Sequence, residues 1–434
     1  MQMKSFVLIA AVVLSLGGCQ THLMTTPAIV SDGHINPFDH VVPEYQNSEA
    51  PVFVASARTV SGKTKYPAQY YTTKRSRMVR VGLATLEIGP GMTWDELVEE
   101  SMVAKRSHNP EIALTAYEEY GPLWSTAWPP DFSFERDWDA AGIERGPADR
   151  FVEAIEEHLA RSRRKEITIY VHGFNTKFEE NLKRASEFWH YMERDEVLVS
   201  FDWASKGSLF SYEVDKANAN FAIRQFRELL EFLATDTSAE RINIIAHSAG
   251  NPIAIEALRQ LSLKYYDLDD AEAQRRAKIG HVVFAAPDAD LDTSLSAGVD
   301  GAGRVTQGFI VYASRKDKAL GFSGGIFGDV RLGNSIGKLT DDERDALIAS
   351  DKQWIDVAEA EKHSSTWLGH SYFHDNPWVS SDLMIFLRTG ATAEERGLVR
   401  DMETGFLTFP DDYEEQLPAI VKRIREKYTT ELLK

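Results

Sequence analysis

Residues 242–251 read Ile-Asn-Ile-Ile-Ala-His-Ser-Ala-Gly-Asn, an apolar stretch of strand type that ends where a helical pattern begins. A serine between small residues at a strand-to-helix junction is typical of a nucleophile elbow. The turn is so tight that only small side chains fit two positions before and after Ser248, and Ala246 and Gly250 meet this demand. The sequence therefore predicts that the Ser248 hydroxyl stands clear of the backbone at the carboxyl edge of a sheet.

A second β-branched stretch, residues 167–175, ends in His-Gly-Phe-Asn. In sites built on a nucleophile elbow, one oxyanion-stabilising N–H comes from the residue after the nucleophile, and the other comes from the loop after an earlier strand. We therefore expect the backbone N–H groups of Ala249 and Phe174 to form the oxyanion hole, with Gly173 allowing close approach. His172 is expected to brace this loop and not to act as a base.

The residues after Ser248 supply an acid and a histidine in the order that such a site requires. Strands are predicted over residues 281–286 and 309–314, and an aspartate follows each of them. Asp317 follows the second strand, which is the usual position of the acid. Asp288 follows the first strand and is the alternative acid.

A further strand over residues 354–358 precedes a Gly-His-Ser turn, which places His370 where the base is expected. His363 and His374 are the alternative histidines. The base would take the proton from Ser248, and the acid would hold the imidazole in the correct tautomer. This chemistry requires neither a metal nor a cofactor, and the spacing of His, Asp and Glu suggests no metal site.

Alternating strand and helix patterns predict the fold class. Between the two glycine-containing motifs we expect a helix over residues 177–194, a strand over 197–201 and a helix over 213–234. Such alternation indicates an α/β fold in which a mostly parallel central sheet is flanked by helices.

Together these motifs resemble the alpha/beta-hydrolase superfamily, and within it a bacterial family of uncharacterised esterase/lipase-like proteins. The motifs that carry the resemblance are Tyr-Val-His-Gly-Phe-Asn at 170–175, Ala-His-Ser-Ala-Gly-Asn at 246–251, Ala-Ala-Pro-Asp at 285–288, Tyr-Ala-Ser-Arg-Lys-Asp-Lys-Ala-Leu at 312–320 and Gly-His-Ser-Tyr-Phe at 369–373. An early Phe-Val-Ala-Ser-Ala-Arg at 53–58 resembles the opening strand of that family. The family commonly has methionine where this chain has Ala249, a change that affects pocket shape more than mechanism.

The resemblance implies an alpha/beta-hydrolase fold and hydrolysis of an ester-like bond. We therefore expect a serine hydrolase that cleaves small-molecule carboxylic esters through an acyl-enzyme, with an apolar acyl group suggested by the aromatic content. Amide or thioester cleavage by the same residues is one alternative. A non-catalytic envelope protein that binds a partner on a hydrolase scaffold is the other, because a fold does not by itself imply a function.

The amino terminus predicts export and lipid attachment. Residues 6–16 form an apolar stretch far shorter than the roughly 20 residues that span a bilayer, which is typical of a signal peptide. The following Leu-Gly-Gly-Cys resembles a bacterial lipoprotein signal, and Cys19 is the single cysteine of the chain. We expect residues 1–18 to be removed and Cys19 to anchor the protein by lipid on the periplasmic side of the envelope. Gln20 indicates the outer membrane if the host is Gram-negative.

The predicted organisation has three parts after the signal peptide. Residues 19–49 are expected to be a lipidated cysteine and flexible tether, 50–390 the catalytic domain, and 391–434 a docked helical extension. An insertion over about 89–165 carries Trp94, Trp124, Trp128 and Trp138, which either form a cap or pack onto the core. The Gly- and Phe-rich start of residues 321–337 is a candidate lid.

Composition fits a folded, acidic protein. Hydrophobic residues make up 43% of the chain, enough for a sizeable core, and the net charge is −18. This charge argues against binding to nucleic acid or to anionic lipid headgroups, because both repel an acidic surface. Membrane contact is therefore expected through the lipid anchor.

Overall fold

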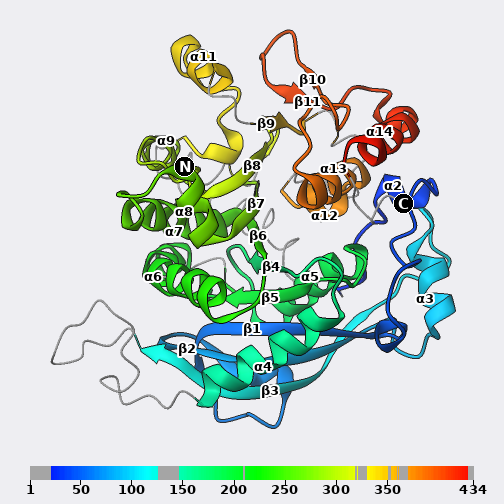
Figure 1. Cartoon of the computed structure of the whole chain (residues 1–434), viewed down its shortest axis with the longest axis vertical. Helices are drawn as coiled ribbons and strands as arrows, with labels where there is room; N and C mark the ends of the chain where they lie inside the picture. Colours follow the sequence, from blue (N-terminus) through cyan, green and yellow to red (C-terminus); the bar gives the residue numbers. More distant parts are fainter. Residues whose placement is uncertain are drawn as a thin grey trace, which may run out of the picture.

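The structure is a computed structural model that describes residues 21–125, 146–208, 211–317, 320, 330–349, 353–358, 360 and 370–428. The predicted signal peptide (1–18) and Cys19 lie outside these residues. Within them, eleven strands form one sheet in the order β10-β11-β9-β8-β7-β6-β4-β5-β1-β2-β3 (Figure 1). The strands are β1 Glu49–Val60, β2 Tyr71–Ile88, β3 Ile112–Ser125, β4 Glu166–Val171, β5 Val197–Asp202, β6 Arg241–His247, β7 Ile279–Ala285, β8 Thr306–Ala313, β9 Gln353–Asp356, β10 Val399–Arg400 and β11 Leu407–Thr408.

The central strands of the sheet run parallel to one another. Strands β1, β5, β4, β6, β7, β8, β9 and β11 pair in parallel, whereas β2, β3 and β10 pair antiparallel at the two edges. Parallel strands buried on both faces need apolar residues at successive positions, as in residues 169–171 of β4 and 244–246 of β6. The carboxyl ends of all these parallel strands therefore lie at one edge of the sheet, which is where Ser248 follows β6.

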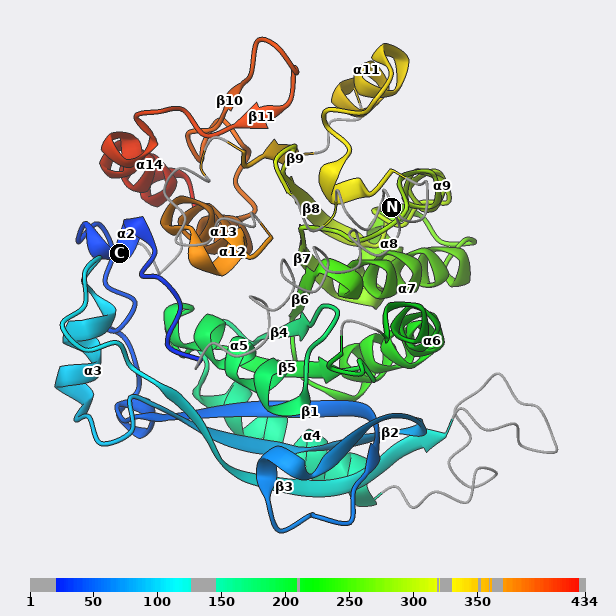
Figure 2. The same ribbon diagram turned by 180° about the vertical axis from the view of Figure 1, so that it is seen from behind.

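Helices cover both faces of the sheet (Figures 1 and 2). One face packs against α3 Trp94–Ser101, α5 Phe178–Tyr191, α13 Pro377–Thr389 and α14 Tyr413–Lys427. The other face packs against α4 Gly146–Arg161, α6 Tyr212–Asp236, α7 Asn251–Lys264, α8 Asp270–Ala277 and α9 Leu291–Val299. Neighbouring residues of one strand enter opposite cores, as Ile244 and Ile245 of β6 do, because side chains alternate across a strand.

The predicted α/β fold with a mostly parallel sheet flanked by helices is confirmed. The strands expected at 53–58, 197–201, 281–286, 309–314 and 354–358 lie in or largely overlap β1, β5, β7, β8 and β9. The helices expected over 177–194 and 213–234 correspond to α5 and α6. Among the helices of the described residues, none combines the length and the apolar character that crossing a membrane demands.

The flexible tether predicted over residues 19–49 is corrected by the structure. From Leu23 onward this segment is packed into the domain, with Ile29 and Val30 fully buried and Phe38 nearly so. The Ile29 N–H donates to Ser381 Oγ of α13 at 3.0 Å. The polar composition misled the prediction because a few irregularly spaced apolar side chains are enough to fill the space beside α3, α5 and α13.

The described part of the predicted insertion (89–165) extends the sheet. It contributes α3, the outermost strand β3 and α4, with Leu97, Leu123 and Phe151 fully buried. Trp94 packs edge-on against Phe38 with ring centroids 5.7 Å apart, which favours the packing interpretation over a cap. The side chain of Trp124 and the whole of Trp128 and Trp138 lie outside the described residues. So do residues 321–329 of the candidate lid.

The carboxyl-terminal extension is docked on the domain as a helix and a small hairpin. Leu417, Ile420 and Ile424 of α14 are fully buried, in agreement with the helical pattern. The hairpin β10–β11 was not predicted, and β11 adds to the sheet in parallel beside β9. Its strands have two residues each, too short to leave a periodic pattern in the sequence.

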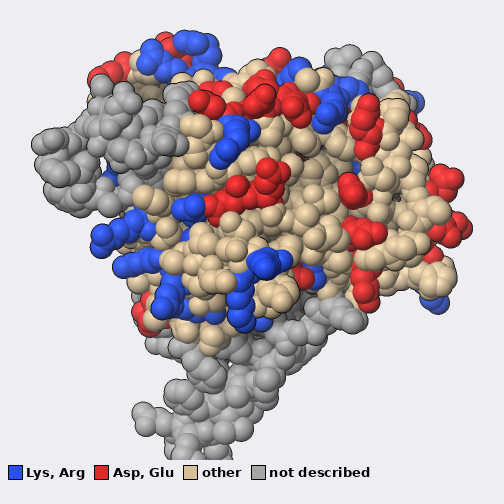
Figure 3. Space-filling view, turned by 90° about the horizontal axis from the view of Figure 1, so that it is seen from below, with Lys and Arg blue, Asp and Glu red and all other residues tan. Residues whose placement is uncertain are grey.

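The acidic excess is unevenly spread over the surface. Figure 3 shows one face on which basic side chains gather toward one side, while acidic side chains lie in clusters in the middle and on the other side, among uncharged residues. The β1–β2 hairpin carries an exposed basic group, namely Lys63, Lys65, Lys74, Arg75 and Arg77. The net charge of −18 is therefore an average over unlike regions.

Candidate active site

Ser248 sits in a strained turn between β6 and α7. Its φ of +50° is unusual for a residue with a side chain, and it begins a short 3-10 helix, Ser248–Gly250, that leads directly into α7. A Cβ on Gly250 would lie 2.6 Å from the carbonyl oxygens of both Val171 and His172, and Ala246 is fully buried. The demand for small residues inferred from the sequence thus has a direct steric cause.

The structure brings Ser248, His370 and Asp317 together. His370 Nε2 lies 2.9 Å from Ser248 Oγ, and His370 Nδ1 lies 2.8 Å from Asp317 Oδ2. All three side chains lie at the carboxyl edge of the sheet. Along the chain, Asp317 precedes His370 by 53 positions and Ser248 precedes it by 122. A serine linked to an imidazole, which is itself held by a buried carboxylate, has the geometry of an activated nucleophile.

Backbone and side-chain contacts fix the Asp317 carboxylate. Asp317 follows β8 and is 1% exposed. The Asp317 Oδ1 accepts a hydrogen bond from the Leu320 N–H at 2.9 Å. The Asp317 backbone carbonyl accepts one from Asn334 Nδ2 at 2.7 Å. These contacts leave Oδ2 directed at His370.

His370 is held from its other side by His247. His247 Nε2 lies 3.3 Å from the His370 carbonyl oxygen, and the His247 ring packs 4.5 Å from that of Phe373. Burial lowers the pKa of His247 well below its usual range, and the nearby His370 lowers it further. The neutral His247 therefore serves to place the backbone of His370 without adding a charge beside it.

The environment of His370 favours its protonated form. Burial acts to lower the pKa of His370, but the Asp317 carboxylate outweighs this effect and Asp288 adds to it, so the net shift of the pKa is upward. An upward shift is what stabilising an imidazolium requires. The Asp317 carboxylate would therefore stabilise the imidazolium if His370 took the proton of Ser248.

The alternative residues are occupied elsewhere. Asp288 accepts from Tyr212 Oη at 2.9 Å and lies 3.4 Å from Arg331 Nε. His374 Nδ1 lies 2.7 Å from Asp375 Oδ1 and 3.2 Å from Arg184 Nη1. His363 lies outside the described residues.

The loop after β4 touches the nucleophile. A Cβ on Gly173 would lie 2.8 Å from Ser248 Cβ, so only glycine permits this approach. Phe174 directly follows Gly173, and Ala249 directly follows Ser248. The two predicted oxyanion residues are therefore adjacent to this contact. The Phe174 ring packs edge-on against Tyr212 with centroids 5.3 Å apart, which forms an aromatic wall beside the loop.

His172 braces this loop, as predicted. Its side chain is fully buried and stacks on Trp203 with centroids 5.0 Å apart. Its Nδ1 lies 2.8 Å from the Gly173 carbonyl and its Nε2 lies 3.1 Å from the Trp203 carbonyl. Both ring nitrogens are thus engaged with backbone, away from Ser248.

Several residues of this region escaped the sequence analysis. Tyr212 and Arg331 hold Asp288, while Arg58 and Asp202 lie behind the loop after β4. The signal available for the last two was their position, because each is a charged residue at or near the carboxyl end of a largely apolar strand. Within the described ranges, no three His, Cys, Asp or Glu side chains are grouped as metal ligands would be.

Comparison with known proteins places the chain among hydrolase folds. Residues 148–388, more than half of the chain, match the family described as "Alpha/beta hydrolase of unknown function (DUF900)". This range contains Ser248, Asp317 and His370. No curated protein matches the chain.

Solved structures of esterase B from Lactobacillus rhamnosis are also similar to this chain. A C6-C4 SN3 inhibited form is 16% identical, with 39% of this chain and 63% of that chain covered and a TM-score of 0.24. A second structure, from HN001, is 14% identical, with 39% and 62% covered and a TM-score of 0.25. The similarity thus spans less than two thirds of that esterase.

Proposed function

This chain belongs to the alpha/beta-hydrolase family of unknown function, and from that premise we propose that it is a serine hydrolase that cleaves carboxylic esters. The observation that carries the proposal is the pair of contacts made by His370, 2.9 Å to Ser248 Oγ and 2.8 Å to Asp317 Oδ2. Burial of Asp317 and the strained turn at Ser248 support it, because both are typical of preorganised catalytic groups.

In the proposed mechanism, Ser248 Oγ attacks the ester carbonyl while His370 Nε2 takes its proton. The N–H groups of Phe174 and Ala249 stabilise the oxyanion of the tetrahedral intermediate. When the intermediate collapses, His370 returns the proton to the leaving alcohol and an acyl group remains on Ser248. Water then attacks the acyl-enzyme, with His370 acting again as base, and releases the acid. Asp317 stabilises the imidazolium in both halves.

A matched substrate panel tests the bond that is cleaved. The purified protein is given an ester, a thioester and an amide of the same acyl group, and acid release is measured for wild type and Ser248→Ala. We expect the ester to be cleaved fastest and the variant to lose turnover. Faster amide or thioester cleavage would replace the ester proposal by that alternative. No turnover of any of the three by folded wild type would favour a binding protein on a hydrolase scaffold.

We also propose that the protein is anchored in the bacterial envelope through a lipid on Cys19. The support is the amino-terminal sequence alone: an apolar stretch at 6–16 and the single cysteine after two glycines. A lipid there would hold the domain close to the bilayer, because the chain is buried in the domain from Leu23 onward. Incorporation of a fatty-acid analogue into wild type but not into Cys19→Ala is the expected result; equal incorporation would contradict it.

A further inference from the structure

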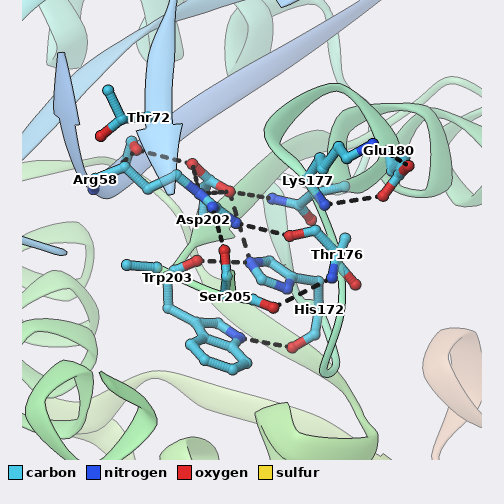
Figure 4. Close-up of polar contacts among 12 residues, drawn as sticks. Arg58, Thr72, His172, Thr176, Lys177, Glu180, Asp202, Trp203 and Ser205 are labelled. Carbon is cyan, nitrogen blue, oxygen red and sulfur yellow. Dashed lines mark hydrogen bonds and ion pairs between the residues drawn. The ribbon is translucent and has the colours of Figure 1, made fainter. Parts of the chain in front are cut away.

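A buried ion pair joins the carboxyl ends of two neighbouring strands. Arg58 of β1 and Asp202 of β5 are 1% and 0% exposed, and Arg58 Nε lies 2.9 Å from both carboxylate oxygens of Asp202. Ser56 Oγ donates to Asp202 Oδ2 at 2.8 Å. Figure 4 shows the pair in the space between the sheet and the loops that follow β4 and β5.

The rest of the guanidinium is bonded to those two loops. Arg58 Nη2 donates to the Thr176 carbonyl at 2.9 Å, in the loop after β4, and Nη1 donates to the Ser205 carbonyl at 2.7 Å, in the loop after β5. Ser205 Oγ in turn accepts from the Thr176 N–H at 3.2 Å and donates to Asp215 of α6 at 2.7 Å. The far end of the loop after β4 is therefore fixed by Arg58 (Figure 4).

Asp202 and its neighbour Trp203 fix the near end of the same loop by contacting His172. His172 Nε2 lies 3.5 Å from Asp202 Oδ1, and Trp203 Nε1 donates to the His172 carbonyl at 2.7 Å. Between His172 and Thr176 lies Phe174, and Gly173 is in contact with Ser248. A small movement of this loop would displace the Phe174 N–H relative to the nucleophile.

We infer that Arg58 and Asp202 are positioning residues that hold the Phe174 N–H in the oxyanion hole. This inference rests on the proposed function, because it assigns the loop a part in ester hydrolysis. It requires no contact between either residue and the substrate. Oxyanion donors act through preorganisation, so a loop that relaxes by a fraction of an ångström loses transition-state stabilisation without losing substrate binding.

The choice of an arginine supports this role. A fully buried ion pair stabilises a fold no better than well-packed apolar side chains do, because both charges must be desolvated. A planar guanidinium, however, can bind a carboxylate and two carbonyl groups at once in fixed directions. Burial acts to raise the pKa of Asp202, but Arg58 and then His172 outweigh it and hold that pKa below its usual value. The carboxylate thus stays charged and keeps the guanidinium in place.

A matched control lies at the other end of β5. Glu196, just before the strand, is paired with Arg388 at 3.3 Å, and both side chains are 0% exposed. Thr168 Oγ1 also donates to Glu196, at 2.9 Å. This pair is as buried as Arg58–Asp202 but lies at the amino edge of the sheet, away from Ser248. Its loss should affect folding without affecting the oxyanion.

The test compares Arg58→Met, the double variant Arg58→Met/Asp202→Leu and the control Arg388→Met. For each we measure the melting temperature, kcat and KM for an ester, and the inhibition constant of a trifluoromethyl ketone, which forms a tetrahedral adduct with an active-site serine. All assays are made well below the melting temperature of the variant. The double variant removes both charges, so it should regain melting temperature relative to the single variant.

We expect Arg58→Met to lower kcat roughly 100-fold, the effect of losing one oxyanion donor, with KM changed less than about threefold. The inhibition constant of the ketone should rise by about the factor by which kcat/KM falls. The double variant should keep the low kcat, and Arg388→Met should keep the wild-type kcat. Wild-type kcat in either Arg58 variant, or an equal loss of kcat in Arg388→Met, would overturn the inference. Absence of turnover in wild type would instead refute the proposed function.

Discussion

Replacing Asp317 by asparagine should lower kcat by about four orders of magnitude. The carboxylate is 1% exposed and 2.8 Å from His370 Nδ1. Two unit charges at that separation attract by about 6 kcal/mol at an effective dielectric constant near 20. This attraction exists only once His370 has taken the proton of Ser248, so its loss raises the barrier. A 10⁴-fold fall in rate corresponds to a barrier raised by about 5.4 kcal/mol, which is close to the whole of this attraction.

The assay is steady-state hydrolysis of a chromogenic ester at a pH above the pKa of His370, with Asp288→Asn as the matched control. Asp288 also lies near His370, but its carboxylate is held by Tyr212 and Arg331. The control should therefore lose less than about tenfold in kcat, since it perturbs only the surroundings of the base. Circular dichroism establishes that both variants are folded.

The assignment of the acid to Asp317 is refuted if the folded Asp317→Asn variant keeps more than about one hundredth of the wild-type kcat, since a buried charge at 2.8 Å would then be contributing little. It is also refuted if Asp288→Asn is the more damaging of the two changes. That result would assign the acid to the strand directly after the nucleophile, the alternative that the sequence left open.

Further predictions concern pH, the elbow and the amino-terminal segment. Because the neutral form of His370 is the base and its pKa is raised, kcat/KM should rise with pH through a midpoint above 6.5, as a pH–rate profile would measure; a midpoint below 6.5 would contradict the raised pKa. Gly173→Ala would place a Cβ 2.8 Å from Ser248 Cβ, so kcat should fall at least roughly tenfold; unchanged kcat would show that the loop can yield. Ile29→Ala should lower the free energy of unfolding by about 2–5 kcal/mol in urea titrations without altering kcat, because Ile29 is fully buried against α13 and belongs to the packing of the domain; no loss of stability would support a tether.

The central architecture could be predicted because its signals are local. Strands such as 281–286 are continuous apolar runs, and helices such as 213–234 have helical periodicity. The order of serine, acid and histidine along these strands then located Ser248, Asp317 and His370 at one edge. Each inference needed only neighbouring residues and the rule that parallel strands end at the same edge.

The remainder could not be predicted because it depends on long-range packing. Residues 23–41 have irregularly spaced apolar side chains that distant elements bury. Ile29 bonds to Ser381 of α13, 352 positions away, and Phe38 packs against Trp94 of α3 and Tyr191 of α5. The edge strand β3 is defined by its pairing with β2, and β11 by its pairing with β9. The Arg58–Asp202 pair joins residues 144 positions apart, and nothing local in either strand indicates the partner.

The most direct test of the central claim is to identify the residue that a fluorophosphonate labels. The purified protein is treated with the probe, digested and mapped by mass spectrometry, with His370→Ala and Ser248→Ala treated in parallel. We expect one phosphonate adduct, on Ser248 and no other serine, with the rate of labelling strongly reduced in His370→Ala. An adduct on a different residue, or no adduct on folded wild type, would contradict the assignment of Ser248 as an activated nucleophile.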